Sequence, residues 1–314
     1  MNAVKEIDVL VSEVGPRDGL QSVSAIMPTE RKYQWIAALA AAGLREIEVG
    51  SFVPATLLPQ MADVADVVKY ALSLPGLYVT ALSPNLRGAQ AAFAAGVDKV
   101  TLPVSVSEPH SLANVRKSHA QMIDEVKAVV ALRNAQYPGV KIEAGLSTAF
   151  GCSIQGVVPE DDVIRLAVTM AQCGVDEVGL SDTAGMANPV QIRRLFPRLR
   201  GEIGADRTGG AHLHNTYGQG LANVVAALEV GIRTFDSSQG GLGGCPYAPG
   251  ATGNIVTEDL VFLLESMGLR TGVNLEQLIA ARRILGDSLP GEPLYGYAPE
   301  AGLHKAFRYA QEAV

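Results

Sequence analysis

Residues 78–104 read YVTALSPNLRGAQAAFAAGVDKVTLPV, and this stretch contains the whole repeating unit of the chain. A short run of apolar and β-branched residues, Tyr78–Leu82, is followed by a polar turn and an alanine-rich segment, Leu86–Ala95. Gly96 then follows this segment, as a left-handed glycine commonly ends a helix, and a second apolar run begins at Lys99. The pattern predicts a strand, a helix and a second strand.

The same strand-then-helix unit recurs along the chain. The predicted strands are Ile7–Val14, Glu46–Val49, Tyr78–Leu82, Lys99–Val104, Lys141–Leu146, Glu177–Leu180, Gly210–His214 and Thr234–Asp236. The predicted helices are Pro28–Ala42, Gln60–Leu74, Leu86–Ala95, Ser111–Tyr137, Pro159–Gln172, Pro189–Arg200, Gly220–Val230 and Thr257–Met267. Proline is expected in the first turn of several helices, at Pro28, Pro159 and Pro189. Glycine is expected to end several, at Gly43, Gly96, Gly174 and Gly231.

About eight such units in one chain predict an α/β protein with a parallel sheet covered by helices. This number favours closure into a (β/α)8 TIM barrel. The alternative is an open doubly wound sheet, which is disfavoured because no glycine-rich dinucleotide fingerprint follows the first strand. Residues 1–314 are expected to form a single catalytic domain, in which Gly272–Val314 packs as a helical and loop-rich C-terminal appendage.

Composition narrows the class of partner. The net charge of −7 and the pI near 5.3 argue against nucleic acid as the main partner. Three cysteines form an odd, sparse set that does not resemble a disulfide framework. The sequence shows no secretory signal, no transit peptide and no apolar run long enough for a membrane span. A cytoplasmic protein that works away from membranes is therefore expected.

Four side chains near the predicted strand ends have the chemistry of metal ligands, and the catalytic groups of such barrels lie at these ends. His212 and His214 are two residues apart on a strand, so both imidazoles project from the same face. Asp18 follows the first strand and Asn254 follows the last. A carboxylate, two imidazoles and an amide oxygen suit Mg²⁺ or Mn²⁺ better than a structural zinc. The alternatives are a turn role for Asp18 and two core histidines.

Two further residues are candidates for catalysis. Cys245 lies in the glycine-rich loop after the last strand, where access to the thiol is expected, and the alternative is a small apolar residue. Arg17 precedes Asp18 and is suited either to a carbonyl or enolate oxygen or to a surface ion pair. The remaining histidines show no pairing and are expected at the surface or behind the site: His110, His119 and His304.

Six segments resemble the 3-hydroxy-3-methylglutaryl-CoA lyase family. The similarity extends from about Ile7 to Leu278, and the loop Gly-Gly-Leu-Gly-Gly-Cys-Pro is its most specific element. Isopropylmalate synthases and 4-hydroxy-2-oxovalerate aldolases share only the Arg-Asp-Gly and His-x-His parts. The segments are Glu13–Gln21 (EVGPRDGLQ), Ser51–Val53 (SFV), Pro59–Asp63 (PQMAD), Asp182–Gly185 (DTAG), His212–Leu221 (HLHNTYGQGL) and Asp236–Asn254 (DSSQGGLGGCPYAPGATGN).

The resemblance implies a role for each matching residue. The four predicted ligands match the metal ligands of the family. Arg17 matches the arginine that steadies the enolate oxygen, and Cys245 matches the catalytic thiol of a mobile loop. Glu48 and Asp182 match acidic residues near the reacting centre. The residues expected to hold the substrate, besides Arg17, are Gln21, Ser51 and Asn114.

The activity that the resemblance implies is a divalent-metal-dependent retro-Claisen cleavage. A 3-hydroxy-3-methylglutaryl-CoA-type thioester would give acetyl-CoA and acetoacetate, so the expected partner is an acyl-CoA. The resemblance also implies a homodimer or a higher homo-oligomer. The group that takes the hydroxyl proton is open between Asp182, acting through a water, and Cys245.

Departures from the family pattern leave the acyl group open. Ser22–Ser24 stands where the family has an Asn-Glu-Lys run, Gly179 replaces a serine, and Asn215 replaces an aspartate. The tail Leu289–Leu303 also differs. A lyase for a longer branched or citramalyl-type thioester is therefore an alternative. A 2-oxo-acid condensing enzyme is less favoured, since the cysteine loop matches the lyases and this length leaves no room for a long regulatory domain. The intact catalytic set argues against a non-catalytic binding protein.

Overall fold

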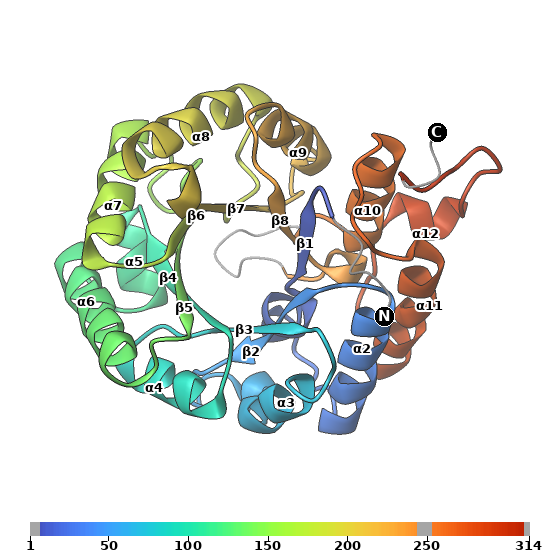
Figure 1. The fold of residues 1–314 in the computed structure, drawn as a ribbon, viewed down its shortest axis with the longest axis horizontal. Helices are drawn as coiled ribbons and strands as arrows, with labels where there is room; N and C mark the ends of the chain where they lie inside the picture. The colour runs from blue at the N-terminus through green and yellow to red at the C-terminus, as the bar shows by residue number, and fades with distance from the viewer. Residues whose placement is uncertain (1–6, 244–252, 311–314) are drawn as a thin grey trace.

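The computed structural model describes residues 7–243 and 253–310 and contains a closed barrel of eight parallel strands (Figure 1). The strands follow one another in chain order, and the first pairs with the last along Leu10–Glu13 and Thr234–Ser237. The TIM barrel is therefore confirmed and the open sheet is wrong. The strands are β1 (Leu10–Glu13), β2 (Glu46–Ser51), β3 (Tyr78–Leu82), β4 (Lys99–Ser105), β5 (Lys141–Ser147), β6 (Glu177–Asp182), β7 (Thr208–Leu213) and β8 (Thr234–Ser237).

Helices surround the barrel (Figure 1). Helices α10, α11 and α12 pack together outside the barrel, and α11 also packs against α2. None of the helices in the described ranges combines the length and apolarity that a membrane span requires. The main helices are α2 (Thr29–Ala41), α3 (Val64–Ala71), α4 (Leu86–Ala95), α5 (Glu108–Asn114), α6 (His119–Gln136), α7 (Glu160–Cys173), α8 (Pro189–Ile203), α9 (Gly220–Glu229), α10 (Thr257–Ser266), α11 (Leu275–Ser288) and α12 (Tyr297–Ala301). A short α1 (Leu20–Ser22) follows β1.

The C-terminal segment is joined to the barrel by packing and by hydrogen bonds. Helix α11 packs against α2, and its Leu278 is completely buried. The backbone oxygen of Leu278 accepts a hydrogen bond of 2.7 Å from the side chain of Gln239. Asn274, which caps α11, donates its backbone N–H to Ala42 at 2.7 Å. These contacts attach α11 to the end of α2 and to the segment that follows β8.

Several predicted element boundaries were wrong, and the largest difference has a local reason. The long helix predicted over residues 111–137 is two helices, because Arg116 adopts a left-handed conformation (φ 57°) and Ser118 starts α6 with a capping box. Helix α3 begins only at Val64, after a short 3-10 turn. Strand β1 is confined to Leu10–Glu13. The four helix-ending glycines all have positive φ, as predicted, whereas Pro28 and Pro159 precede their helices by one residue.

The strands present an apolar face to the helices and a polar face to the barrel interior. Val100 and Ile142 are completely buried on the outer face, as are their alternate neighbours along β4 and β5. The inward positions on the same strands include Lys99 and Glu143, which line an internal cavity. Most barrels of this class fill the interior with layers of branched apolar side chains. This barrel therefore depends on polar pairing inside and on apolar packing outside.

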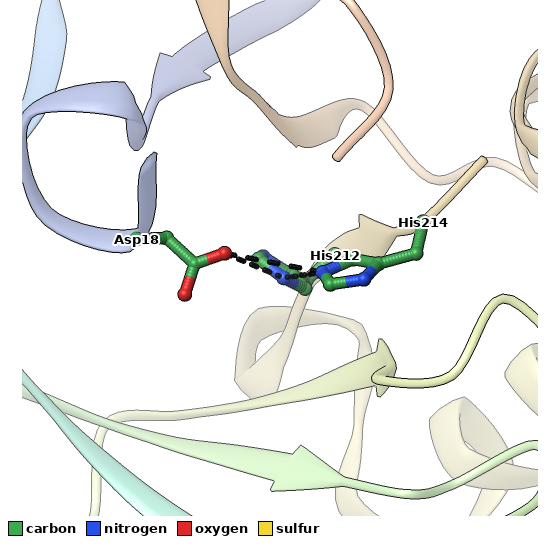
Figure 2. Close-up of side chains that lie close together, drawn as sticks. All are labelled: Asp18, His212 and His214. Carbon is green, nitrogen blue, oxygen red and sulfur yellow. Dashed lines mark hydrogen bonds and ion pairs between the residues drawn. The ribbon is translucent and has the colours of Figure 1, made fainter. Parts of the chain in front are cut away.

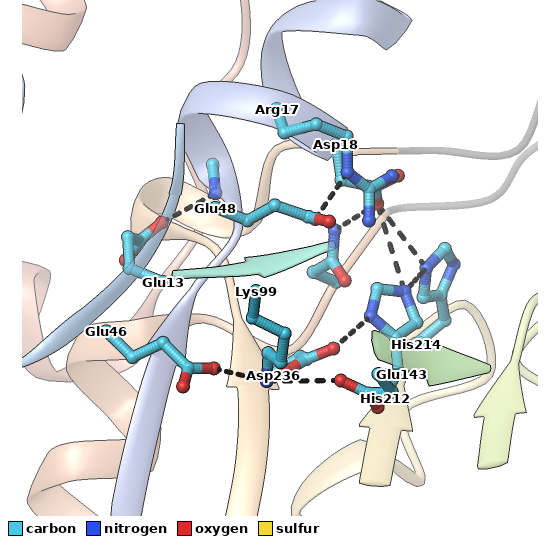
Figure 3. Close-up of polar contacts among 12 residues, drawn as sticks. Glu13, Arg17, Asp18, Glu46, Glu48, Lys99, Glu143, His212, His214 and Asp236 are labelled. Atoms are coloured by element: carbon cyan, nitrogen blue, oxygen red, sulfur yellow. Dashed lines mark hydrogen bonds and ion pairs between the residues drawn. The ribbon is translucent and has the colours of Figure 1, made fainter. Parts of the chain in front are cut away.

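Lys99 is the cation at the centre of this interior. Its ammonium lies 3.0 Å from Oε1 of Glu46 and 3.1 Å from Oε2 of Glu143 (Figure 3). Burial disfavours the charge of Lys99, but the two carboxylates raise its pKa well above the ordinary value. Burial also raises the pKa of Glu143, and the ion pair opposes this rise. The three side chains come from β2, β4 and β5, so the cluster connects neighbouring strands.

Replacing Lys99 by methionine tests whether the fold depends on the ion pairs of Lys99 with Glu46 and Glu143. We expect Lys99→Met to lower the free energy of unfolding by about 3–5 kcal/mol, because it leaves two buried carboxylates without their cation. Lys141→Met is the matched control: Lys141 is 58% exposed in its ion pair with Asp176, and its loss should cost at most about 1 kcal/mol. Urea unfolding of both variants measures the difference. Equal stabilities of the two variants would contradict the prediction.

Candidate active site

A single turn of π-helix after β1 positions Arg17 and Asp18. The turn spans Gly15–Gly19, and the backbone N–H of Asp18 donates to the oxygen of Val14 at 2.7 Å. Beneath it lies Glu13, which is fully buried. Glu13 Oε1 accepts hydrogen bonds from the backbone N–H groups of Gly15 (2.8 Å) and Gln239 (2.9 Å). The carboxylate of Glu13 therefore fixes the turn that carries the candidate site residues.

The two histidines at the end of β7 face Asp18, as Figure 2 shows. The Nε2 atoms of His212 and His214 lie 3.0 Å apart, and each lies 3.9 Å from Oδ2 of Asp18. Burial and the neighbouring His212 lower the pKa of His214 to about 3, so this imidazole is neutral. The alternative of two core histidines is therefore wrong, because both imidazoles project toward the carboxylate of Asp18.

Asp236 on β8 orients His212. The Nδ1 atom of His212 donates a hydrogen bond of 3.0 Å to Oδ2 of Asp236. Because an ionised carboxylate only accepts, this bond places the proton on Nδ1 and leaves the lone pair on Nε2. Burial opposes charge on His212, yet the bond to Asp236 raises the pKa of this imidazole. Carboxylate partners of this kind commonly fix the tautomer of metal-binding histidines.

Asn254 is the fourth residue of the cluster and contacts Asp18. Its Nδ2 group donates to Oδ2 of Asp18 at 2.7 Å and to the oxygen of Leu242 at 3.0 Å. Its Oδ1 atom is buried and has no hydrogen-bond partner. Gly243 lies so close that a side chain there would collide with both Asn254 and Asp18, and its φ is +112°. The amide oxygen is therefore the one atom of Asn254 left for another ligand.

These residues fit a divalent cation. One ligand atom from each of Asp18, His212 and His214 lies within 4.8 Å of the others. The unpartnered amide oxygen of Asn254 adds a second oxygen donor. A buried polar atom without a partner is costly unless something binds it. A mixed oxygen and nitrogen donor set is the kind that Mg²⁺ and Mn²⁺ accept.

Arg17 lies beside the cluster in a fixed orientation (Figure 3). Its Nε donates to Oε2 of Glu48 at 2.5 Å, and its Nη1 donates to Asp18. Arg17 and Glu48 are both buried, so the alternative of a surface ion pair is wrong. The Nη2 group makes no hydrogen bond to a described residue and remains available to a substrate oxygen.

The site opens into a cavity of about 670 Å³, a size typical of small-molecule sites. Ser51 is buried, and its hydroxyl has no hydrogen-bond partner. Helix α5 ends at Asn114, which is exposed at the cavity mouth. The predicted site residues that line this cavity are Arg17, Asp18, Gln21, Glu48, Ser51, Asn114, His212 and His214.

Two predicted catalytic residues, Asp182 and Cys245, are not among the residues that line the cavity in the described part of the chain. Asp182 is buried at the end of β6, and its Oδ1 accepts the backbone N–H groups of Met186 (2.7 Å) and Ala187 (3.0 Å). Its Oδ2 is buried without a partner, and burial raises its pKa to about 7. Asp182 does not line the cavity, although its neighbour Ser181 does. Cys245 lies outside the described residues.

Sequence reasoning missed several residues of this site. Asp236, Glu13 and Lys99 were given no role, although Asp236 was expected at the end of the strand next to that of His212. The expectation for His110 was wrong. It is buried in the cavity wall with Nδ1 at 2.7 Å from the hydroxyl of Ser105, a pairing that brings β4 and α5 together.

Comparison with known proteins identifies the family to which the chain belongs. The sequence profile of the HMGL-like family matches residues 8–285. The chain belongs to the HMGL-like family. It is a carbon–carbon lyase by this membership, and a hydroxymethylglutaryl-CoA lyase of Bacillus subtilis is 41% identical over 91% of this chain and 94% of its own length.

Two further relatives of the HMGL-like family are similar over most of the chain. The cytoplasmic 3-hydroxy-3-methylglutaryl-CoA lyase of Homo sapiens is 39% identical over 87% of this chain and 73% of its own length. A structure of an HMG-CoA lyase from Acinetobacter baumannii, in complex with coenzyme A and 3-methylmalate, superposes with a TM-score of 0.89. It is 37% identical and covers 98% of this chain and 99% of its own.

The bond between Asp236 and His212 gives a test of the cation site. We expect Asp236→Asn to weaken Mn²⁺ binding by roughly 10- to 100-fold, because the amide no longer fixes the tautomer of His212. Electron paramagnetic resonance of free Mn²⁺ measures the affinity without a need for substrate. Asp206→Asn, at an exposed aspartate outside the barrel, is the control and should bind Mn²⁺ like the unchanged protein. An unchanged affinity in Asp236→Asn would refute the positioning role.

Proposed function

We propose that the chain catalyses the divalent-metal-dependent cleavage of 3-hydroxy-3-methylglutaryl-CoA to acetyl-CoA and acetoacetate. The observation that carries the proposal is the convergence of Asp18, His212, His214 and Asn254 on one point beside the fixed guanidinium of Arg17. The names of the relatives support the substrate. The proposed metal is Mg²⁺ or Mn²⁺.

The reaction sets two requirements. The bond between C3 and the methylene carbon beside the thioester breaks, and its electron pair moves to that carbon as an enolate, which then takes a proton. The C3 hydroxyl loses its proton as its oxygen becomes a carbonyl. A divalent cation, when bound, acidifies such a hydroxyl and stabilises the forming carbonyl oxygen. Its proposed ligands are the four residues of the cluster.

Arg17 is proposed to stabilise the enolate. Its Nε and Nη1 groups are held by Glu48 and Asp18, and its Nη2 group has no described partner. A donor fixed before the reaction loses little freedom when charge develops on the substrate oxygen. Glu48 therefore has the proposed role of orienting Arg17 toward the cavity.

Proton transfer is proposed to involve Asp182 and Cys245. Asp182 lies behind the cavity wall, so it would act on the hydroxyl through a water, with its unpartnered Oδ2 as acceptor. Cys245, the family's catalytic thiol, is proposed to exchange a proton with the substrate. A Cys245→Ala variant with unchanged turnover would remove the thiol from the mechanism.

Substrate contacts follow from the cavity lining. Gln21 and Ser51 are proposed to hold the acyl portion, and Asn114 at the mouth to contact the acyl-CoA. The coenzyme A found with the Acinetobacter baumannii relative supports an acyl-CoA as partner. Residues 1–314 are proposed to act as one catalytic domain, with residues 272–314 as its appendage, and to assemble as a homodimer or higher oligomer.

Metal removal tests the reaction directly. We expect exhaustive chelation to abolish acetoacetate formation from 3-hydroxy-3-methylglutaryl-CoA, and added Mg²⁺ or Mn²⁺ to restore it, because the hydroxyl needs a cation to lose its proton. A coupled assay for acetoacetate measures the rate. Undiminished cleavage after chelation would end the metal proposal. Release of free thiol from acetyl-CoA and a 2-oxo acid, without lyase activity, would favour a condensing enzyme.

Replacing Arg17 tests the enolate role. We expect Arg17→Ala to lower kcat by roughly 10²- to 10³-fold, the loss of about 2.7–4 kcal/mol seen when one preorganised donor is removed. Arg193→Ala is the control, since Arg193 forms an exposed ion pair with Glu229. Circular dichroism and Mn²⁺ affinity establish that the variant is folded. A folded Arg17→Ala with ordinary kcat would exclude the proposed role.

A further inference from the structure

The cavity continues past the cation site into the interior of the barrel. Gly210 lies two residues before His212 on β7 and lines this lower part, together with Gly179 on β6 and Gly145 on β5. Gly145 and Gly179 are paired in register, and a side chain at Gly179 would meet the backbone oxygen of Gly210 at 3.3 Å. Three neighbouring strands thus present no side chain directly below the site. We call this region the lower chamber.

Hydroxyl groups from other strands also line the lower chamber. Ser12, Thr80 and Thr101 line the lower chamber, and Ser12 and Thr80 are each 2% exposed. None of the three hydroxyls hydrogen-bonds to a residue in the described ranges. All three residues face the cavity, so their hydroxyls are available to a polar ligand or to water. The lower chamber is therefore equipped to bind something polar.

The floor of the lower chamber is charged but already paired. Lys99 contacts Glu46 and Glu143, as Figure 3 shows, and Asp236 also acts on its charge. Two carboxylates therefore contact the ammonium, and the more distant Glu177 and Asp236 add to the negative charge around it. A further anion would meet repulsion from them, and a purely apolar group would bury the ion pairs without replacing their contacts with water.

The departure at residue 179 creates part of this floor. A Cβ atom at Gly179 would lie 2.5 Å from Oε1 of Glu143, so a serine there would displace this carboxylate. Glu143 can therefore keep its present position because residue 179 is glycine. The carboxylate of Glu143 lies where the serine side chain of the family motif would lie.

We infer that the lower chamber receives the C3 substituent of the substrate, and that besides methyl it accepts a larger substituent that ends in an uncharged hydrogen-bonding group, such as an alcohol. The inference rests on the proposed function, because the C3 carbon is located only if its hydroxyl binds at the cation site. A terminal alcohol can donate to Glu143 and accept from the hydroxyl of Thr101. The additional substrates are 3-hydroxy-3-(hydroxyalkyl)glutaryl thioesters of coenzyme A.

Three synthetic thioesters test this selectivity. They carry methyl, n-butyl or 3-hydroxypropyl at C3, and the last two have the same number of heavy atoms. Cleavage of each gives acetyl-CoA and the corresponding 3-oxo acid, so release of acetyl-CoA reports all three rates. We expect kcat/KM for the 3-hydroxypropyl substrate to exceed that for the butyl substrate by at least ~10-fold, because butyl offers no hydrogen-bond partner to the polar groups that line the chamber.

Variants of the chamber make the test specific. A Cβ at Gly145 meets Thr101 Cγ2 at 3.5 Å and the backbone oxygen of Leu102 at 4.0 Å, both ordinary contacts, so Gly145→Ala fits the fold and extends into the chamber. It should lower the ratio of kcat/KM for the 3-hydroxypropyl to the methyl substrate by roughly 10-fold. Thr101→Val should reduce the preference for 3-hydroxypropyl over butyl. Gly201→Ala on α8, with open space around it, is the control and should change neither ratio.

The outcomes separate the two proposals. If none of the three thioesters is cleaved in the presence of Mg²⁺ or Mn²⁺, the proposed function fails, and this inference fails with it. If the methyl substrate is cleaved but the butyl substrate reacts as well as the 3-hydroxypropyl substrate, the function stands and the chamber assignment is overturned. A Gly145→Ala variant whose substrate ratios equal those of Gly201→Ala would also overturn it.

Discussion

The ammonium of Lys99, held between Glu46 and Glu143 inside the barrel, is the contact on which the rest of the interior depends. Because this one cation pairs with carboxylates from β2 and β5, two acidic side chains can be buried inside the barrel. An interior of this kind needs no layers of apolar side chains. The space that such layers would fill is part of the cavity.

The cation site and the lower chamber lie one above the other along the barrel axis, and they draw on partly different parts of the chain. The proposed ligands come from the turn after β1, from the end of β7 and from the segment after residue 253. The chamber is lined by residues of all eight strands, among them the glycines of β5, β6 and β7. Strand β7 and Asp236 contribute to both regions, whereas Gly145, Gly179 and Thr101 contribute to the chamber alone.

The sequence was sufficient for the features that depend on local periodicity. Strand and helix alternation predicted the barrel, and the spacing of His212 and His214 placed both imidazoles on one face. Asp18 and Asn254 were recognised as ligands by their chemistry and by family resemblance. The bond from Asn254 to Asp18 agrees with this grouping, although the cation itself stays a prediction.

Features that depend on contacts between distant segments were not accessible from the sequence. The ion pairs of Lys99 require the register of three strands, and the bond from Asp236 to His212 requires two neighbouring strand ends at the same height. The break before α6 depends on a left-handed Arg116, which no local rule predicts for an arginine. The burial of His110 likewise follows from the way α5 folds back on β4.

Gly243 and Gly253 have a consequence for substitutions near the cation site. A side chain at Gly253 would meet the backbone of Gly243 at 3.1 Å, and one at Gly243 would collide with Asn254. Neither glycine supplies a proposed ligand. A larger residue at either position is nevertheless expected to displace the amide of Asn254, so the absence of two side chains is part of what keeps the ligands in place.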